Sequence, residues 1–228
     1  MNFVMSYSGG KDGALALHRM MSANHKPVAL ITTINIEQER SWFHGIEKDI
    51  LETVAKSIGV PLIACECLPD EYAESFEKGL AKASALGATA CVFGDIDIAD
   101  HRKWNEERCM SAGLECILPL WDEEREKLVI ELIESGFKAL IKIVQCNKLD
   151  DSFLGKDLTI PLMEKIKLTG SDVCGENGEY HTFVHDGPIF RSPIHITTKN
   201  VVDFGTHKAI ALELYYSSHL SIAKVLQR

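Results

Sequence analysis

The hexapeptide Ser8-Gly9-Gly10-Lys11-Asp12-Gly13 is the segment of this chain best suited to chemistry. Its glycines allow positive φ, so that consecutive backbone N–H groups can curl around an anion. An apolar run ends just before it and a helical pattern begins just after it, so the N-terminus of that helix adds unpaired N–H groups. Lys11 adds a full positive charge, Ser8 can donate its hydroxyl, and Asp12 can cap the helix or orient a phosphate-bound Mg²⁺. These residues predict a polyphosphate site.

The segment differs from two common phosphate-binding patterns, since neither G-x-x-x-x-G-K-[ST] nor G-x-G-x-x-G is present. The plain alternative is a Gly-Gly turn with a solvated lysine. Its place at the first strand–helix junction favours the phosphate site, because ligands of open α/β sheets bind beyond the carboxyl ends of the strands.

A second polar cluster, Gly94 to Cys109, follows the fourth expected strand. Gly94 and Asp95 should lie at the same sheet edge as the hexapeptide, where Asp95 could meet a metal or a ribose. His101 and Arg102 could reach phosphate or substrate. The alternative is an exposed helix with surface ion pairs, and we favour it for Lys103, Glu106 and Arg108.

A third cluster runs from Cys174 to Thr182 as C-G-E-N-G-E-Y-H-T. Its carboxylates, Glu176 and Glu179, could bind an ammonium ion, take a proton from it or hold Mg²⁺. His181 stands at the start of a strand. Taken alone, the same residues would also suit a solvated turn.

The elements that must position these clusters alternate regularly in the first half of the chain. Apolar patterns predict strands and helices in turn, as strand–helix–strand units of a parallel sheet require. The expected strands are 3–7, 27–33, 62–67, 90–93 and 115–118, and the expected helices are 14–21, 45–58, 71–86 and 100–112. We therefore expect an α/β, Rossmann-like parallel sheet with helices on both faces.

The rhythm changes after a helix expected at 125–134. A mixed α+β pattern follows, with strands at 139–144, 181–184, 189–197 and 209–216 and a short helix at 159–167. We place a boundary near Gly136, which divides the chain into a nucleotide domain, 1–136, and a smaller substrate-binding domain, 137–228.

Composition bounds the classes of protein to consider. The 228 residues carry 24 Lys and Arg against 33 Asp and Glu, a net charge of −9, and 46% are hydrophobic. Residues 1–136 hold 13 basic and 23 acidic residues (net −10), and residues 137–228 hold 11 and 10 (net +1). Such a chain lacks the basic field of a non-specific nucleic-acid binder. No apolar run approaches the roughly 20 residues that cross a bilayer.

Cysteine usage points to a reducing compartment. The seven cysteines are scattered, mostly within apolar runs, and no C-x-x-C pair occurs. We expect reduced thiols and a cytoplasmic protein without a membrane partner.

The hexapeptide resembles the PP-loop, S-G-G-x-D-[SG], of the ATP pyrophosphatase superfamily. Taken with further motifs, it makes the chain resemble the diphthine–ammonia ligase family from about residue 2 to residue 217. Those motifs are W-F-H at 42–44, G-D-I-x-x-x-D-H-R at 94–102, C-G-E-N-G-E-Y-H-T-F at 174–183 and D-G-P-I-F at 186–190.

The resemblance implies a PP-loop domain joined to a smaller carboxyl-terminal domain. ATP would activate a carboxylate as an acyl-adenylate, and ammonia would attack it to give an amide, AMP and pyrophosphate. Archaeal and eukaryotic members amidate diphthine, a modified histidine of an elongation factor. Here Asn177 stands where glycine is common, and His181 where an acid is often found. Bacterial relatives carry similar variants. The resemblance therefore predicts the type of reaction for this chain better than it predicts the substrate.

The resemblance also implies roles for residues. ATP would be held by Ser8, Gly9, Gly10, Lys11, Asp12, Gly13, Thr33 and Gly94, with adenine near 32–35. The catalytic candidates are Lys11, Asp95, Glu176 and Glu179, and the substrate-side candidates are His44, His101, Arg102 and His181. Mg²⁺ should arrive with the nucleotide and needs no all-protein site.

Other readings stay open. A tRNA-thiolating enzyme shares the PP-loop, and Cys174 could serve as its thiol. A non-catalytic ATP-binding sensor shares the general architecture. The acceptor carboxylate could belong to a protein or to a small metabolite, and apolar stretches in the second half could support a homodimer.

Overall fold

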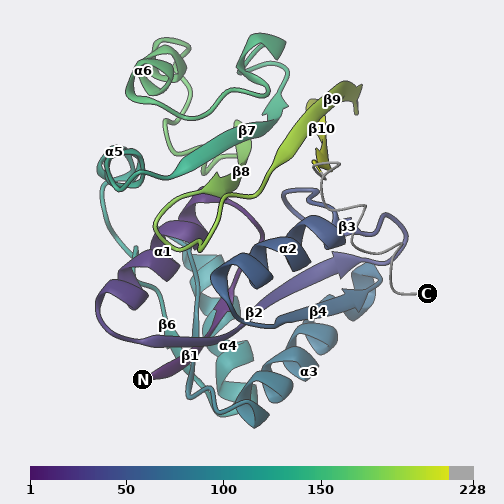
Figure 1. Cartoon of the computed structure of the whole chain (residues 1–228), viewed down its shortest axis with the longest axis vertical. Helices are drawn as coiled ribbons and strands as arrows, with labels where there is room; N and C mark the ends of the chain where they lie inside the picture. Colours follow the sequence, from purple (N-terminus) through teal and green to yellow (C-terminus); the bar gives the residue numbers. More distant parts are fainter. Residues whose placement is uncertain (216–228) are drawn as a thin grey trace, which may run out of the picture.

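The structure, a computed structural model, describes residues 1–215. Its strands form two sheets (Figure 1). The strands before residue 118 belong to the first sheet, and those after residue 137 belong to the second. The first half contains β1 (Asn2–Ser6), α1 (Lys11–Ser22), β2 (Lys26–Asn35), β3 (Arg40–Ser41), α2 (Lys48–Ile58), β4 (Leu62–Cys67), α3 (Tyr72–Ala85), β5 (Ala90–Val92), α4 (Ala99–Ala112) and β6 (Glu115–Ile117). The second contains α5 (Arg125–Glu134), β7 (Lys138–Gln145), α6 (Ile160–Leu168), β8 (Tyr180–Asp186), β9 (Ile196–Asp203) and β10 (His207–Leu214).

The first sheet confirms the expected α/β class. Its parallel strands lie in the order β4-β2-β1-β5-β6, and the two-residue β3 adds an antiparallel pair to the end of β2. Counting the parallel strands alone, the order is 3-2-1-4-5, so the winding direction reverses between β1 and β5. Ligands of doubly wound sheets bind at this point, beyond the carboxyl ends of the strands.

The strands are apolar on both faces because helices cover both. Val4 of β1 packs in a cluster with Phe76 and Leu80 of α3. Phe3 and Met5 face the opposite way, into a larger cluster that contains the apolar faces of α1 and α2. Alternate residues of a strand point to opposite faces, so a strand between two helical layers reads as a continuous apolar run.

The larger cluster also joins the two halves. It continues from α1 and α2 through α5 into the second sheet, where Leu140 and Ile141 of β7 and Phe183 and Val184 of β8 are buried. In Figure 1 the second sheet accordingly lies against the α1 and α2 side of the first sheet. The second sheet is antiparallel, in the order β8-β7-β10-β9.

Local sequence accounts for most element ends. α2 ends at Gly59, whose φ of 93° is left-handed, and Pro61 follows it. A glycine accepts this conformation without the clash that a Cβ would cause. The expected helix over 45–58 begins only at Lys48, because residues 41–46 form a closed turn.

The strand expected at 189–197 is wrong for most of its length. Residues 187–192 contain turns and bends, residues 193–195 are irregular, and β9 begins at Ile196. Pro188 and Pro193 have no N–H to donate to a ladder. The N–H of Arg191 instead donates to the Ser57 carbonyl at the end of α2, at 3.0 Å. Tyr216, at the end of the strand expected over 209–216, lies outside the described residues. Within residues 1–215 no helix is long and apolar enough to span a membrane.

Candidate active site

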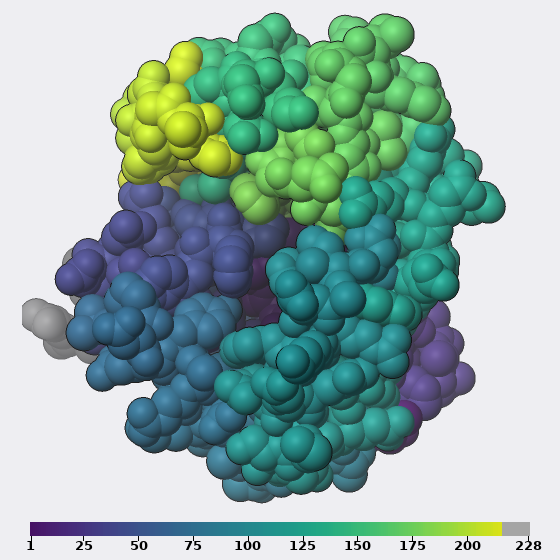
Figure 2. Space-filling view, turned by 180° about the vertical axis from the view of Figure 1, so that it is seen from behind, coloured from purple at the N-terminus to yellow at the C-terminus, as the bar shows by residue number. Residues whose placement is uncertain are grey.

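A cavity of about 570 Å³ opens at the reversal point of the first sheet. Figure 2 shows it as a hollow between the two halves, with atoms of the purple N-terminal segment at its base. The segments that line it are the loop after β1, the ends of β2 and β5, residues 43–44, α3, α4, the loop before β8 and the start of β8. Most of the predicted site residues are among its lining: Ser8, Gly10, Lys11, Asp12, Gly13, Thr33, His44, Gly94, Asp95, His101, Glu176 and His181.

The loop after β1 needs its glycines. Gly9 has a φ of 95°. A Cβ on Gly10 would lie 2.3 Å from the His44 Nε2, and one on Gly94 would lie 2.6 Å from the Gly13 nitrogen. The segment after β5 therefore packs directly against the start of α1. This close approach brings both predicted clusters into one cavity.

Strand β8 of the second sheet supports this loop. The Val184 N–H donates to the Gly9 carbonyl at 2.8 Å, and the Lys11 N–H donates to the Thr182 Oγ1 at 3.0 Å. β8 pairs with β7 along one edge, and its other edge meets the PP-loop. The second half of the chain thus holds the anion-binding backbone of the first. The sequence pattern did not predict this contact of Thr182.

Lys11 is buried, with 5% of its surface exposed. Its ammonium donates to both carboxylate oxygens of Asp12, at 2.9 and 2.7 Å, and lies 5.8 Å from the centre of the Tyr180 ring. Burial alone would lower the pKa of this ammonium, but the surrounding acidic groups, Asp12 first among them, together outweigh burial and raise the pKa well above its usual value. Lys11 therefore presents a permanent positive charge at the base of the cavity.

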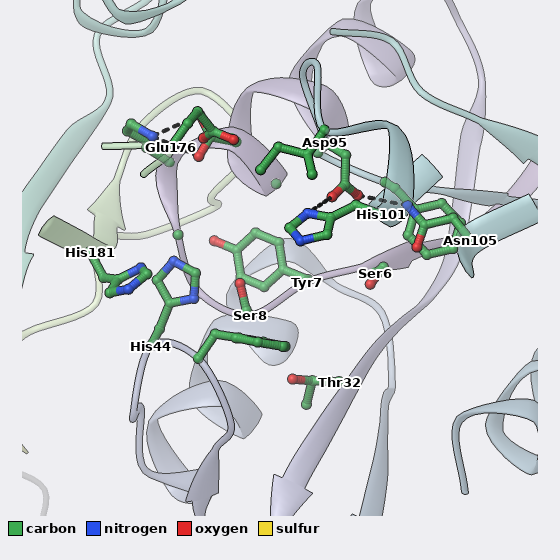
Figure 3. Close-up of a pocket in the computed structure, with 18 of the residues that line it drawn as sticks. Ser6, Tyr7, Ser8, Thr32, His44, Asp95, His101, Asn105, Glu176 and His181 are labelled. Atoms are coloured by element: carbon green, nitrogen blue, oxygen red, sulfur yellow. Dashed lines mark hydrogen bonds and ion pairs between the residues drawn. The ribbon is translucent and has the colours of Figure 1, made fainter. Parts of the chain in front are cut away.

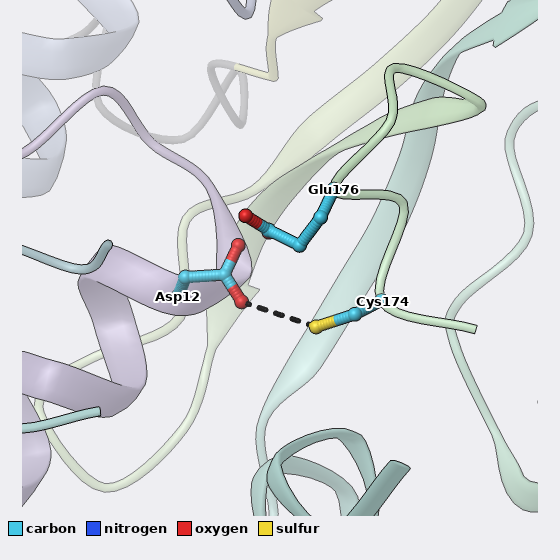
Figure 4. A group of neighbouring side chains, drawn as sticks. All are labelled: Asp12, Cys174 and Glu176. Carbon is cyan, nitrogen blue, oxygen red and sulfur yellow. Dashed lines mark hydrogen bonds between the residues drawn. The ribbon is translucent and has the colours of Figure 1, made fainter. Parts of the chain in front are cut away.

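Asp12, Cys174 and Glu176 form a compact group beside Lys11, drawn from both halves of the chain (Figure 4). The ligand atoms of the three side chains lie within 4.8 Å of one another, and the Cys174 thiol lies 3.7 Å from Asp12 Oδ1. The pKa of Glu176 is raised to about 7, chiefly by burial; Lys11 acts to lower it, and Asp12 acts to raise it. A carboxylate in this range can give or take a proton near neutral pH.

The Cys174 thiol is neutral at physiological pH. It is buried, and burial raises its pKa well above the usual value, although Lys11 acts in the opposite direction. Sulfur chemistry needs the thiolate, so this environment does not suit a sulfur-transferring nucleophile.

Internal hydrogen bonds shape the loop that carries Glu176. The Asp172 carboxylate accepts from the backbone N–H groups of Cys174 at 3.1 Å and Glu176 at 3.0 Å. Arg125, at the start of α5, donates to Asp172 at 2.6 Å and to both oxygens of Asp97 at 2.7 Å. One guanidinium therefore ties the Glu176 loop to the segment that follows β5.

Glu179, predicted from the sequence as a catalytic residue, is not among the residues that line the cavity. It is 2% exposed, and its carboxylate accepts from the N–H groups of Asp172 at 3.2 Å and Asn177 at 3.1 Å. A buried carboxylate occupied by backbone donors organises the loop and has no free path to a substrate.

Asp95 is fixed by two residues of α4. Its oxygens lie 3.1 Å from the His101 Nδ1 and 2.8 Å from the Asn105 Nδ2 (Figure 3). The hydrogen bond to the Asp95 carboxylate raises the pKa of His101 above its usual value, so the pair favours a protonated imidazole. When protonated, His101 adds a second cationic group to the lining of the cavity.

Arg102 points elsewhere, which corrects its expected contact with substrate. It does not line the cavity, and its guanidinium donates to Glu106 at 2.7 Å and stacks 5.0 Å from the centre of the Trp121 ring. His101 and Arg102 are neighbours on α4, so successive 100° steps around the helix direct them differently.

His44 and His181 meet on the other side of the cavity (Figure 3). Their ring centres lie 5.0 Å apart in an edge-to-face arrangement. Burial lowers the pKa of His181 to about 4, and burial together with the nearby charges of Lys11 and Lys142 lowers that of His44 well below its usual value. Both rings are neutral at pH 7, when each has one donor and one acceptor nitrogen.

An apolar wall completes the cavity near the end of β2. The Thr33 hydroxyl donates to the Tyr72 hydroxyl at 3.0 Å, and the Tyr72 ring packs 5.8 Å from that of Trp104. Phe76 and Phe93 continue this wall. The sequence predicted Thr33 at the nucleotide but not these aromatic residues, because the helical spacing of Tyr72 and Phe76 on α3 is also that of a core face.

Comparison with known proteins decides the family. A model of the diphthamide synthase N-terminal domain matches residues 1–116, about half of the chain, and a model of the C-terminal domain matches residues 124–214. This chain belongs to the diphthamide synthase family. The two matches meet between residues 116 and 124, at the segment that leads into α5.

Alignments with individual relatives cover most of this chain. The diphthine–ammonia ligase of Bos taurus is 28% identical over 90% of this chain and 85% of its own length, and that of Homo sapiens is 27% identical over 86% and 82%. A solved structure, a predicted subunit of tRNA methyltransferase from Methanocaldococcus jannaschii, aligns with a TM-score of 0.44 and 16% identity. That alignment covers 81% of this chain and 96% of the other.

Proposed function

We propose that this member of the diphthamide synthase family is an ATP-dependent ligase that adenylates a carboxylate and transfers ammonia to it, releasing AMP and pyrophosphate. One observation carries the proposal. A buried, permanently charged lysine on a backbone anion loop shares its cavity with a carboxylate whose pKa is about 7. The first suits pyrophosphate departure, and the second suits proton transfer from an amine.

In the first step the acceptor carboxylate attacks the α-phosphorus of ATP, and the bond to the pyrophosphate leaving group breaks. The backbone N–H groups of Gly10 and of the first residues of α1 that line the cavity would hold the leaving phosphates. Lys11 would stabilise the charge that develops on them, and such electrostatic stabilisation is commonly worth about 3–4 kcal/mol. Because the pKa of Lys11 is raised, this charge is present at every physiological pH.

Mg²⁺ would enter with the nucleotide and neutralise phosphate charge. The protein fits that role in part, since Asp12 and Glu176 bring carboxylate oxygens close together at the PP-loop. Hard cations prefer such oxygens, whereas the neutral thiol of Cys174 is a poor ligand for Mg²⁺. We assign Asp12 to a cation shared with the phosphates.

In the second step the nitrogen of ammonia attacks the acyl carbon of the adenylate. A C–N bond forms, the bond between the acyl carbon and the AMP oxygen breaks, and nitrogen must lose a proton. Glu176 lines the cavity and can accept that proton in its ionised form, whereas the carboxylate of Glu179 is enclosed by backbone donors. We therefore assign the base to Glu176.

The acceptor is the least constrained part of the proposal. The bovine and human relatives are named as ligases of diphthine, and we propose a carboxylate of this class, carried on a protein, for this chain. A small-molecule carboxylate is the alternative. A tRNA-thiolating enzyme is disfavoured by the neutral Cys174 thiol.

The test is to incubate the protein with ATP, Mg²⁺ and ammonium chloride, adding protein-bound diphthine or one of a panel of small carboxylates. We expect AMP and pyrophosphate in equal amounts, and an amide product only when ammonium is present. ADP and phosphate, or ATP binding without turnover, would contradict the proposal. A thiolated tRNA product would point to the rival enzyme.

A further inference from the structure

Lys142 is a buried lysine that the proposed chemistry does not use. It lies on β7 in the second half, is 2% exposed and does not line the cavity. Its ammonium donates to the backbone carbonyl of Gly45 at 2.6 Å. Gly45 belongs to the first half and directly follows His44, so this hydrogen bond joins the second sheet to the segment that carries a cavity histidine.

An irregularity in the second sheet directs Lys142 toward this partner. Ile141 pairs with Thr182 of β8 and Ile143 pairs with His181, and the register shifts between Ile141 and Ile143. Lys142 is the extra residue of this bulge. A β-bulge bends its strand and changes the direction of a side chain, and bulges often occur beside active sites.

The receiving turn is closed by its own hydrogen bonds. The Gly45 N–H donates to the Ser41 carbonyl at 3.0 Å, and the Ile46 N–H donates to the Ser41 hydroxyl at 3.0 Å. Gly45 itself has a φ of 58°. These bonds satisfy the turn's donors, and the Gly45 carbonyl is left to face Lys142.

His44 needs such support because its own ring is poorly anchored. The buried His44 Nδ1 has no hydrogen-bond partner within the described part of the chain. The ring meets His181 edge to face, and its Nε2 presses against the PP-loop, where a Cβ on Gly10 would lie only 2.3 Å away. The direction of the ring therefore depends on the turn behind it, which carries it against Gly10.

Stability does not account for the lysine. Its ammonium is removed from water and has one hydrogen-bond partner, the Gly45 carbonyl. Burial lowers its pKa, and the attraction of Glu47 offsets this only in part. A methionine of similar length would fill the same space without a buried charge.

We propose that Lys142 is a positioning residue: by holding the Gly45 carbonyl from the bulge of β7, it keeps the His44 ring against the PP-loop. The role rests on the proposed function, since His44 would then contact the phosphates or the acceptor carboxylate. It gives the second half of the chain one more contact that supports the nucleotide site, in addition to those of Thr182 and Val184 on β8.

A double-mutant cycle on AMP formation tests the role, with Lys142→Met, His44→Ala and the double variant. We expect Lys142→Met to lower kcat about tenfold, equivalent to about 1.4 kcal/mol, and the double variant to be no slower than His44→Ala alone. Lys138→Met, an exposed lysine on the same strand that pairs with Asp186, should leave kcat unchanged. Unchanged kcat in Lys142→Met, or additive losses in the double variant, would overturn the proposal.

Two readouts without turnover separate this role from the ligase proposal. The ring protons of His44 and His181 should show a nuclear Overhauser effect in the wild type and in Lys142→Gln, and lose it in Lys142→Met. Thermal unfolding of Lys142→Met should occur at the wild-type temperature or above it. Retention of the ring contact in Lys142→Met overturns the positioning role even if the wild type forms AMP. A wild type that forms no AMP overturns the ligase alone.

Discussion

The backbone N–H of Lys11 donates a 3.0 Å hydrogen bond to the hydroxyl of Thr182, which lies 171 residues further along the chain. The contact joins the first turn of α1 to strand β8 of the other sheet. Together with the bond from Val184 to Gly9 it holds the PP-loop backbone from outside its own domain. The anion site is therefore built by both halves of the molecule.

Removing this hydroxyl should weaken both folding and nucleotide binding. Thr182→Val keeps the shape of the side chain and leaves the buried Lys11 N–H without its partner, at a cost of about 1–3 kcal/mol. We expect a lower urea midpoint and a higher KM for ATP. Thr89→Val, at an exposed hydroxyl, is the control. Equal urea midpoints for Thr182→Val and wild type would contradict the role given to this bond.

Lys11→Met should abolish pyrophosphate release while preserving the fold. Methionine replaces the buried stem of the lysine, and the charge that faces the leaving group is lost. We expect ATP–pyrophosphate exchange to fall by at least about a hundredfold. Lys78→Met, at an exposed helical ion pair, should exchange normally. Wild-type exchange by Lys11→Met would show that the PP-loop assignment is wrong.

Glu176 should set the pH dependence of amide formation. Its pKa is raised to about 7, and the base must be ionised. The kcat/KM for free ammonia should therefore fall as the pH drops below about 7 and level off above it. In Glu176→Gln this acid limb should disappear, and the residual rate should be about 10²–10⁴-fold lower. A rate profile of Glu176→Gln that still bends near pH 7 would assign the base to another group.

Glu179→Gln should act on stability more than on chemistry. The carboxylate accepts N–H groups from two backbone positions, and an amide would place donors against one of them. We expect a loss of about 1–3 kcal/mol in the free energy of unfolding. The acid limb of the rate profile should remain near pH 7. A stable Glu179→Gln protein without that limb would reverse the assignments of the two glutamates.

Gly94→Ala should damage nucleotide binding through packing. Its Cβ would lie 2.6 Å from the Gly13 nitrogen, and backbone atoms cannot move aside as a side chain can. Overpacking of this kind costs about 1–3 kcal/mol. Calorimetry should show ATP affinity at least about tenfold weaker, equivalent to about 1.4 kcal/mol. Wild-type affinity would mean that the segment after β5 is not held against α1.

The local pattern of apolar and turn-forming residues predicted the structure correctly where a single helix or strand determines it. Continuous apolar runs predicted the parallel strands, and Gly59 with Pro61 predicted the end of α2. It failed at 189–197, where the apolar spacing resembled a strand. Two prolines and the bond from Arg191 to Ser57 keep most of that segment out of the sheet.

The residues of the candidate site likewise fall into those that the sequence predicted and those that it did not. The PP-loop could be identified because its glycines, its lysine and the following helix are adjacent in sequence. The separate directions of His101 and Arg102, and of Glu176 and Glu179, could not be predicted from adjacency. They depend on partners supplied by other segments, such as Trp121 for Arg102 and the N–H of Asp172 for Glu179.

By itself the sequence determined a PP-loop at the first strand–helix junction of a parallel α/β sheet, because these features depend on neighbouring residues and on the period of the apolar pattern. Only the tertiary structure decided that β8 holds that loop, that Glu176 has a pKa near 7, and that Lys142 lies behind His44. Each of these depends on the distance between groups far apart in the chain and on their removal from water, and packing of the two halves sets both.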